Sequence, residues 1–196
     1  MSLTAANEPP LLPMTRAEYL AWVEAQPRGR YERIHGIVVE RDGATAMAPE
    51  RSAHNQRKML AWLALRRAIE QAGLACQAHG DGMTVPIDDS DYEPDAVVHC
   101  GASLPGDAIA VPDPVIIVEV LSPSSRKSDR GLKLAEYFKL SSLHHYLIVW
   151  PDKPQVVHHR RDVMTAGGGI DTSIVTSGAI RLDPPGLTIT VEDIYA

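Results

Sequence analysis

Cysteine is scarce in this sequence, since only two of its 196 residues, Cys76 and Cys100, are cysteines. They form no Cys-x-x-Cys pair and are too few for a disulfide framework. Free cysteine is among the residue types that are most often buried. We therefore expect two buried thiols and no disulfide.

Long apolar runs are also lacking, because no segment approaches the roughly 20 residues that a membrane-spanning helix needs. The first residues do not have the basic-then-apolar pattern of a secretory signal. We therefore expect a cytoplasmic protein that does not enter a membrane.

Positive charge is in deficit, since 25 acidic residues face 19 lysines and arginines, a formal net charge of −6. This deficit argues against a large basic surface for nucleic acid, because contacts to phosphates supply much of the affinity of such surfaces. It does not exclude an enzyme that acts on nucleic acid. A Mg²⁺ site is itself acidic, and the bound ion then brings positive charge to the phosphate.

The remaining composition is that of one globular domain. Hydrophobic residues make up 44% and charged residues 22% of the chain, which is typical of folded proteins, and the length suits a single core. Pro9, Pro10 and Pro13 indicate a flexible N-terminal tail over residues 1–13. Residues 14–196 form the expected single domain.

Helix and strand signals are mixed along this domain. Thr15 and Glu18 have the spacing of a capping box, and a segment rich in alanine, leucine and arginine ends just before Gly73. We expect helices over residues 15–25, 52–71, 128–140 and 191–195.

Runs of β-forming residues predict the strands. The strongest run, 115–121, contains valine and isoleucine without alternation, which indicates a strand in the middle of a sheet. Asp88-Asp89-Ser90-Asp91 predicts a turn, and Gly167-Gly168-Gly169 a flexible connection. Further strands are expected at 74–78, 83–87, 95–100, 146–150 and 155–159, with a hairpin over 31–41. The predicted fold class is mixed α/β (α+β), a central mixed sheet flanked by helices.

Glu119 is the most informative residue, because it interrupts the apolar run Val-Ile-Ile-Val-Glu-Val-Leu. A carboxylate in a buried strand is costly unless it is paired, hydrogen-bonded or bound to a metal. The strand alone leaves two interpretations open, a structural ion pair with lysine or arginine and a functional site.

Asp95 is the second acidic candidate, and it follows Pro94 at the start of an apolar stretch. By itself it is also consistent with a solvated turn. Together with Glu119 it predicts two carboxylates at neighbouring strand ends, which are the oxygen ligands that Mg²⁺ or Mn²⁺ prefers. Phosphodiester hydrolysis uses such a metal to neutralise the phosphate, activate water and stabilise the leaving oxygen.

Cations follow Glu119 closely along the chain, namely Arg126, Lys127, Arg130 and Lys133. Asp129 and Lys133 are spaced i, i+4 on one helical face, which Tyr137 continues. This spacing is consistent with a surface ion pair of little energetic value. It is equally the spacing that would place the Lys133 ammonium beside a metal, where it acts on the reacting phosphate.

These residues resemble the Uma-type family of restriction-endonuclease-like proteins, which belongs to the PD-(D/E)XK nuclease superfamily. The most specific block is residues 118–125, Val-Glu-Val-Leu-Ser-Pro-Ser-Ser. The resemblance covers roughly residues 14–196. It also includes Glu93-Pro94-Asp95, Asp129-Arg130 with Lys133 and Tyr137, Tyr31-Glu32 with Gly36, His54, and Leu182-Asp183-Pro184-Pro185-Gly186 with Asp193-Ile194.

The resemblance implies a restriction-endonuclease-like fold, with Asp95 and Glu119 as metal ligands and catalytic residues. The superfamily usually has Glu-x-Lys, which would place lysine at position 121, but this chain has Leu121. Leucine can hold neither a water nor a phosphate. By the family's motif, the catalytic lysine is then Lys133 on the following helix, and Lys127 is the alternative. If neither lysine reaches the metal site, the protein would be a catalytically inactive relative.

Other residues have weaker signals. Glu32 matches an N-terminal acidic position of such nucleases, and it is equally consistent with an exposed glutamate at a strand edge. His54, Lys127 and Arg130 are candidates for substrate contact, and His54 is also consistent with a structural histidine. Histidines 144, 145, 158 and 159 lack a zinc-binding spacing, so we expect them at the surface.

The leading hypothesis is a Mg²⁺- or Mn²⁺-dependent endonuclease that hydrolyses phosphodiester bonds in DNA. Two alternatives stay open. One is a nuclease-fold protein that binds nucleic acid or a protein without cutting, and the other is a metal-dependent hydrolase of a small phosphate ester. Cutting both strands of a duplex commonly requires two active sites, so a homodimer is the expected assembly.

Overall fold

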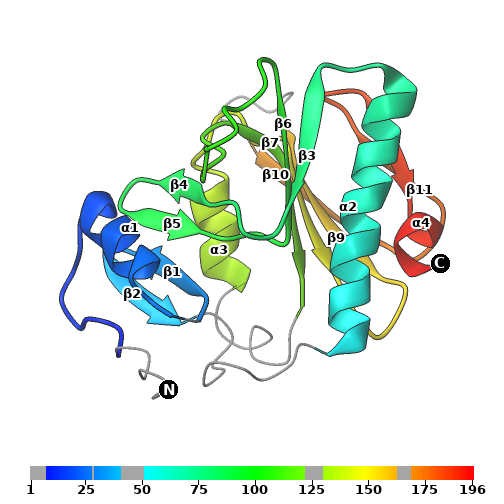
Figure 1. The fold of residues 1–196 in the computed structure, drawn as a ribbon. Helices are drawn as coiled ribbons and strands as arrows, with labels where there is room; N and C mark the ends of the chain where they lie inside the picture. The colour runs from blue at the N-terminus through cyan, green and yellow to red at the C-terminus, as the bar shows by residue number, and fades with distance from the viewer. Residues whose placement is uncertain (1–7, 28, 41–50, 122–129, 163–168) are drawn as a thin grey trace.

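The computed structural model describes residues 8–27, 29–40, 51–121, 130–162 and 169–196. A central sheet lies between two helices, α2 (Ser52–Ala72) and α3 (Arg130–Tyr137) (Figure 1). A smaller sheet lies on the α3 side. The predicted fold class, a central mixed sheet flanked by helices, is confirmed.

The central sheet has six strands in the order β10-β9-β8-β7-β6-β3. All neighbouring strands are antiparallel except β7 and β8, which are parallel. A parallel pair needs a crossover connection, and α3 lies in the chain between these two strands. The six strands are β3 (Cys76–Gly80), β6 (Ala96–Cys100), β7 (Pro114–Val120), β8 (His145–Val149), β9 (Val156–Asp162) and β10 (Gly169–Val175).

The smaller sheet has four antiparallel strands in the order β2-β1-β5-β4. Its strands are β1 (Tyr31–Ile34), β2 (Ile37–Glu40), β4 (Val85–Ile87) and β5 (Ser90–Tyr92). Helix α1 (Arg16–Glu24) precedes it and begins with the predicted capping box of Thr15 and Glu18. Tyr19 of α1 donates a hydrogen bond to the backbone of Tyr31, which fixes the helix on the sheet.

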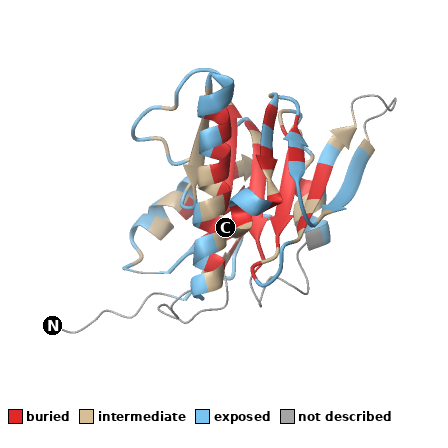
Figure 2. Ribbon diagram, turned by 90° about the vertical axis from the view of Figure 1, so that its right-hand side faces the viewer, coloured by how far each residue is buried: buried red, intermediate tan, exposed pale blue. Residues whose placement is uncertain are grey.

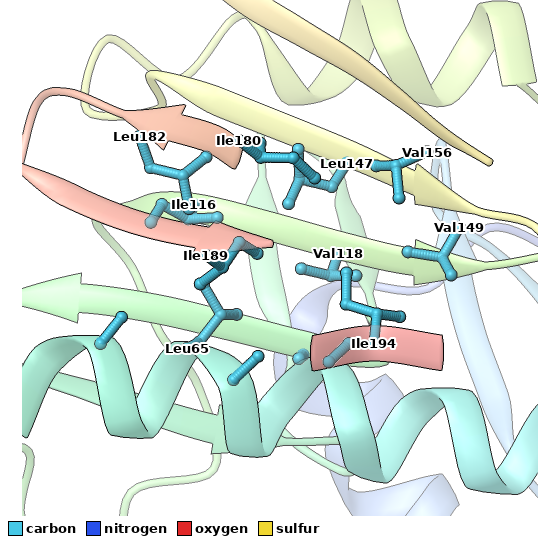
Figure 3. Close-up of a cluster of buried hydrophobic side chains, with 14 of the residues drawn as sticks. Leu65, Ile116, Val118, Leu147, Val149, Val156, Ile180, Leu182, Ile189 and Ile194 are labelled. Carbon is cyan, nitrogen blue, oxygen red and sulfur yellow. The ribbon is translucent and has the colours of Figure 1, made fainter. Parts of the chain in front are cut away.

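The face of the central sheet opposite α3 is covered by α2 and by the C-terminal elements. These are the hairpin β11 (Ala179–Leu182) and β12 (Leu187–Thr190), followed by helix α4 (Val191–Tyr195). Leu65 of α2 and Ile194 of α4 pack with the hairpin onto residues of β7, β8 and β9 such as Val118 and Leu147 (Figure 3). Buried residues are concentrated in the central strands (Figure 2).

Most of the predicted elements are confirmed. The hairpin at 31–41 and the helix that ends before Gly73 are present, and Gly73 has the left-handed backbone conformation that ends the helix. The predicted turn at residues 88–91 is partly wrong, because Ser90 and Asp91 belong to β5. The start of the third helix at 128 and most of the glycine connection at 167–169 lie outside the described residues. The division into a tail (1–13) and one domain (14–196) stays a prediction.

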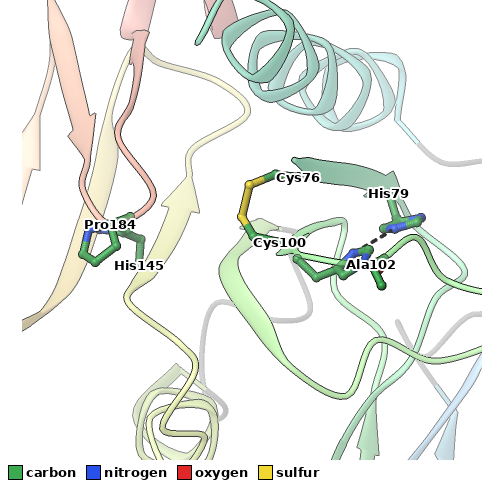
Figure 4. The surroundings of a disulfide bond; sticks show 7 residues. Cys76, His79, Cys100, Ala102, His145 and Pro184 are labelled. Atoms are coloured by element: carbon green, nitrogen blue, oxygen red, sulfur yellow. Dashed lines mark hydrogen bonds between the residues drawn. A yellow bond between two sulfur atoms is a disulfide. The ribbon is translucent and has the colours of Figure 1, made fainter. Parts of the chain in front are cut away.

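The prediction of two buried thiols is wrong. Cys76 and Cys100 form a disulfide (Figure 4), and both side chains are only partly buried. The antiparallel register of β3 and β6 places the two residues directly opposite each other, with their Cα atoms 3.9 Å apart. This pairing depends on strand register, which the spacing of two cysteines in the sequence does not reveal.

The prediction of surface histidines is wrong for His145, His158 and His159, which are all buried. His145 Nε2 lies 2.8 Å from the carbonyl oxygen of Pro184 (Figure 4), and His145 Nδ1 lies 2.9 Å from His158 Nε2. Because a carbonyl only accepts, Nε2 of His145 is the donor there, and Nδ1 of the neutral ring accepts from His158. Burial lowers the pKa of both rings to about 4, and the neighbouring His158 adds to the effect on His145.

Among the described residues, no helix combines the length and the apolar character that crossing a membrane requires.

Candidate active site

Glu119 lies in β7, on the strand that occupies the middle of the central sheet. It is 9% exposed. Side chains alternate along a strand, and Ile117 and Leu121, two positions away on either side, both belong to the apolar cluster on the α3 side. The carboxylate of Glu119 therefore replaces one member of an otherwise apolar row that faces α3.

Asp95 immediately precedes β6, the antiparallel neighbour of β7. Its backbone N–H donates to the carbonyl oxygen of Val118 at 3.0 Å, so the backbone hydrogen bonds between the two strands continue up to Asp95. Its Oδ2 accepts a hydrogen bond of 2.7 Å from the N–H of Val120, the residue next to Glu119. The expected placement of Asp95 and Glu119 on adjacent strands is confirmed, and both carboxylates are buried at the same end of the sheet.

Helix α3 brings two groups to Glu119 from one helical face. Lys133 and Tyr137 are spaced i, i+4. Lys133 Nζ donates to Glu119 Oε1 at 3.1 Å, and the Tyr137 hydroxyl donates to the same oxygen at 2.8 Å. Burial, together with the charges of Glu119 and Glu32, raises the pKa of Tyr137 well above its usual value, so its hydroxyl stays protonated. Lys133 thus brings an ammonium to Glu119, although position 121 is a leucine.

Glu32 reaches the same ammonium from the other sheet. It lies in β1, and Lys133 Nζ donates to its Oε1 at 3.1 Å. The backbone N–H of Glu93 donates to the same oxygen at 3.0 Å. Glu32 is buried, so the alternative of an exposed glutamate at a strand edge is wrong. Lys133 joins the two sheets through carboxylates on each.

Lys58 is a site residue that the sequence analysis missed. It is buried in α2, and its Nζ lies 3.7 Å from Asp95 Oδ1 and 2.6 Å from Asp81 Oδ2. Burial alone would raise the pKa of Asp81, but Lys58 and Arg30 hold it below its usual value. Lysine in a long helix is normally exposed, so nothing in the local sequence distinguished Lys58 from its exposed neighbours.

Arg30 continues this set of contacts. It donates to Asp81 at 2.9 Å and also pairs with Glu93, whose backbone binds Glu32. Among the described residues, contacts of this kind connect eight charged side chains around one end of the sheet. Five are carboxylates and three are cations: Glu32, Asp81, Glu93, Asp95, Glu119, Arg30, Lys58 and Lys133.

The three candidates for substrate contact have different outcomes. His54 is buried at the start of α2, with Nε2 2.8 Å from the carbonyl oxygen of Val120. This is the contact of a hydrogen-bonded structural histidine, and it also fixes the strand end next to Glu119. Lys127 and the side chain of Arg130 lie outside the described residues, so their roles stay predictions.

Asp95 and Glu119 offer carboxylate oxygens, the type of ligand that Mg²⁺ prefers. Within the described parts of the chain, no group of three or more histidine, cysteine, aspartate or glutamate side chains is arranged to enclose a metal. Magnesium is usually bound by one or two carboxylates, with water and substrate phosphate as its other ligands. Two buried carboxylates on adjacent strands fit that requirement.

Comparison with known proteins places this chain among nuclease-like proteins. Residues 16–192 match the Uma2 family, described as "Putative restriction endonuclease". An uncharacterised protein of Synechocystis, slr1290, is 26% identical over 198 residues, which is 95% of this chain and 93% of that protein.

A solved structure shares the fold. A protein of Anabaena variabilis, described as a putative nuclease belonging to DUF820, superposes with a TM-score of 0.67 at 15% sequence identity. The match covers 93% of this chain and 98% of that one.

Proposed function

Because the chain belongs to the Uma2 family of "Putative restriction endonuclease" proteins, we propose that it is a metal-dependent nuclease that hydrolyses phosphodiester bonds in DNA. The observation that carries the proposal is the contact of Lys133 with Glu119 and Glu32, while Asp95 on the adjacent strand accepts from the N–H of Val120, the residue after Glu119. This arrangement supplies the two carboxylates and the lysine that the chemistry requires, although the lysine comes from a different position in the sequence.

Asp95 and Glu119 are the residues that would hold the metal, Mg²⁺ or Mn²⁺. When bound, the ion would lower the pKa of a water and neutralise charge on the phosphate. Two buried carboxylates on adjacent strands support binding of a divalent cation, because carboxylate oxygens are the ligands that Mg²⁺ prefers. The N–H of Val120 orients Asp95, and the hydroxyl of Tyr137 orients Glu119, so both ligands are held before a metal arrives.

Lys133 is the proposed catalytic cation. In the reaction a water oxygen forms a bond to phosphorus, and the bond from phosphorus to the leaving sugar oxygen breaks. Negative charge builds up on the phosphate during this step, and a positioned ammonium stabilises it. Glu32 and Glu119 hold Lys133 at 3.1 Å each, which fixes the ammonium without a rearrangement during the reaction.

Lys58 is the second ammonium at this site, and it approaches Asp95 from α2 on the opposite side of the sheet. We assign it a positioning role, because its shortest contact is with Asp81 and not with the proposed ligands. The DNA substrate, the cytoplasmic location and the choice of Mg²⁺ over Mn²⁺ belong to the proposal. The Cys76–Cys100 disulfide is uncommon in that compartment, so the location needs its own test by cell fractionation.

The test is metal binding and cleavage by matched variants. Calorimetric titration with Mg²⁺ and with Mn²⁺ should show binding to the wild type and none to Asp95→Asn or Glu119→Gln. Both variants should also fail to cut supercoiled plasmid DNA. Glu70→Gln, at an exposed glutamate of α2, should behave as the wild type.

Three other outcomes would overturn the proposal in distinct ways. DNA binding by gel shift without cleavage in either metal would assign the chain to the binding proteins of this fold. Hydrolysis of a small phosphate diester, but not of DNA, would assign it to small-molecule hydrolysis. Metal binding that survives Glu119→Gln would move the metal site elsewhere.

A further inference from the structure

Strand β10 forms one edge of the central sheet. Within the described residues it pairs with β9 alone. The five residues from Ile170 to Ile174 are all exposed. Alternate backbone N–H and C=O groups along its outer side therefore have no strand partner within the described parts of the chain, and such an edge is a template for pairing with another chain.

The opposite edge of the sheet is protected. Strand β3 packs against α2, and the indole N–H of Trp62 donates to the backbone carbonyl of Ala78 on this strand at 3.0 Å. None of the residues of β3 is fully exposed. Natural sheets usually cover their edges in this way or place charged residues and proline there. The β3 edge of the sheet is thus covered by α2, whereas the β10 edge is exposed.

The exposed edge carries apolar side chains that its own chain does not bury. Ile170 is 41% exposed and Ile174 is 64% exposed. They are four positions apart, so they share one face of the strand with Thr172 between them. The one charge in this segment, Asp171, is already paired with Arg160 of the neighbouring strand at 2.8 Å.

The order of these residues is symmetric about Thr172. Reading outward in both directions gives a polar residue, Asp171 or Ser173, and then an isoleucine. A two-fold axis at Thr172 would place Ile170 opposite the partner's Ile174, and Asp171 opposite the partner's Ser173. Each apolar side chain then meets an apolar one, and no two carboxylates are opposed.

We infer that β10 is a dimerisation strand that pairs antiparallel with β10 of a second copy of this chain, centred on Thr172. The two six-stranded sheets then form one continuous sheet across the interface. This assembly stands independently of the proposed nuclease activity, since no residue of the candidate active site takes part. A five-residue strand pair buries a small interface, so the dimer forms in a concentration-dependent equilibrium.

Analytical ultracentrifugation over a range of concentrations tests the interface. The wild type should move from monomer to dimer as its concentration rises. Ile174→Lys places a charge in both apolar pairs of the symmetric interface and should weaken association by at least about tenfold. Ile109→Lys is the control, because Ile109 is also an exposed isoleucine, 52% exposed, but lies away from β10. A wild type that stays monomeric, or an unchanged Ile174→Lys, overturns the inference.

Cross-linking tests the register independently. A cysteine introduced by Thr172→Cys lies opposite its own copy across the axis, so mild oxidation should give a covalent dimer on a non-reducing gel. Ile174→Cys should not cross-link alone, because its copies lie four residues out of register, but the double variant Ile170→Cys with Ile174→Cys should. A dimer that persists without cross-linking through Thr172→Cys would show that the copies meet elsewhere.

Discussion

On one face of the central sheet, Leu65 and Ile194 pack against Val118 and Leu147, and this cluster contains only apolar side chains. On the other face, an apolar cluster that includes Tyr137 lies directly beside the buried charges of Glu119 and Lys133. Both clusters consist of buried apolar residues, so the two faces differ in the charged groups beside them. The apolar cluster on the α2 face contains no charged side chain, whereas the α3 face buries charged groups whose desolvation cost their mutual pairing must offset.

The largest expected effect lies on the α2 face. Leu65→Ala removes a fully buried side chain and should lower the free energy of unfolding by about 2–5 kcal/mol. The rate per folded molecule should not change, because Leu65 does not reach the charged groups. Urea denaturation measures the stability, and Leu132→Ala, at an exposed leucine of α3, is the matched control. A Leu65 variant of normal stability would contradict the division between the faces.

The next effect lies on the α3 face, where a substitution should lower the cleavage rate. Lys133→Ala should lower the cleavage rate by about 10²–10³-fold, the effect of losing one preorganised electrostatic group. Metal binding should be retained, because lysine is not a ligand. Lys139→Ala, at an exposed lysine that pairs with Glu136, should leave the rate unchanged. Near-normal cleavage by Lys133→Ala would return Lys127 to the role of catalytic cation.

The third prediction concerns the histidines on the α2 face, where pH should act on stability. Folding lowers the pKa of His145 and His158 from 6.5 to about 4. Between pH 6.5 and pH 4 the two rings are therefore protonated in the unfolded chain but neutral in the folded protein. Their contribution to the free energy of unfolding is fully present above pH 6.5 and is lost as the pH falls toward 4. The loss should reach on the order of 3 kcal/mol for each histidine.

Urea denaturation at a series of pH values measures this loss. His158→Gln should reduce the pH dependence by roughly half, since one of the two titrating rings is removed. The control is His35→Asn, at an exposed histidine in a left-handed turn conformation that asparagine also adopts. A stability that does not change between pH 6.5 and pH 4 would contradict the buried neutral pair.

The smallest effect is that of Tyr137→Phe on the α3 face. The change keeps the buried ring and removes the hydrogen bond to Glu119. We expect a loss of about 1 kcal/mol in the free energy of unfolding and a rate lowered by roughly fivefold, because Glu119 becomes less well oriented. Tyr146→Phe, at another buried tyrosine of the same cluster, is the control. If Tyr137→Phe lowered the cleavage rate more than Lys133→Ala does, the Tyr137 hydroxyl, and not the Lys133 ammonium, would be the group of α3 that contributes most to catalysis.

The elements and the two carboxylates were predictable because each depends on local sequence. Strand β7 is an apolar run with one acid in it, and a buried acid needs a partner. The placement of Lys133 beside Glu119 was one of two interpretations that the helical spacing left open, because a lysine one helical turn from an aspartate is also the usual pattern of a solvated helix. The family resemblance favoured this placement.

The features that the sequence analysis missed depend on tertiary register. Strand β5 contains Asp91, which reads as a turn residue, but Arg33 and Arg16 neutralise it at 2.7 Å each and allow it to be buried. Lys58 is buried only because α2 crosses the end of the sheet beside Asp95. The disulfide likewise requires the alignment of two strands, which residue types do not specify.

The contact between Lys133 and Glu32 joins positions 101 residues apart in the chain. Contacts of such long sequence separation require a large loop to close and therefore form slowly during folding. The first hairpin, the central strands and α3 must all be in place before the ammonium has both of its carboxylates. A chain that is still folding thus lacks the fixed ammonium, which acquires both carboxylates only when the first hairpin has met the central sheet and α3.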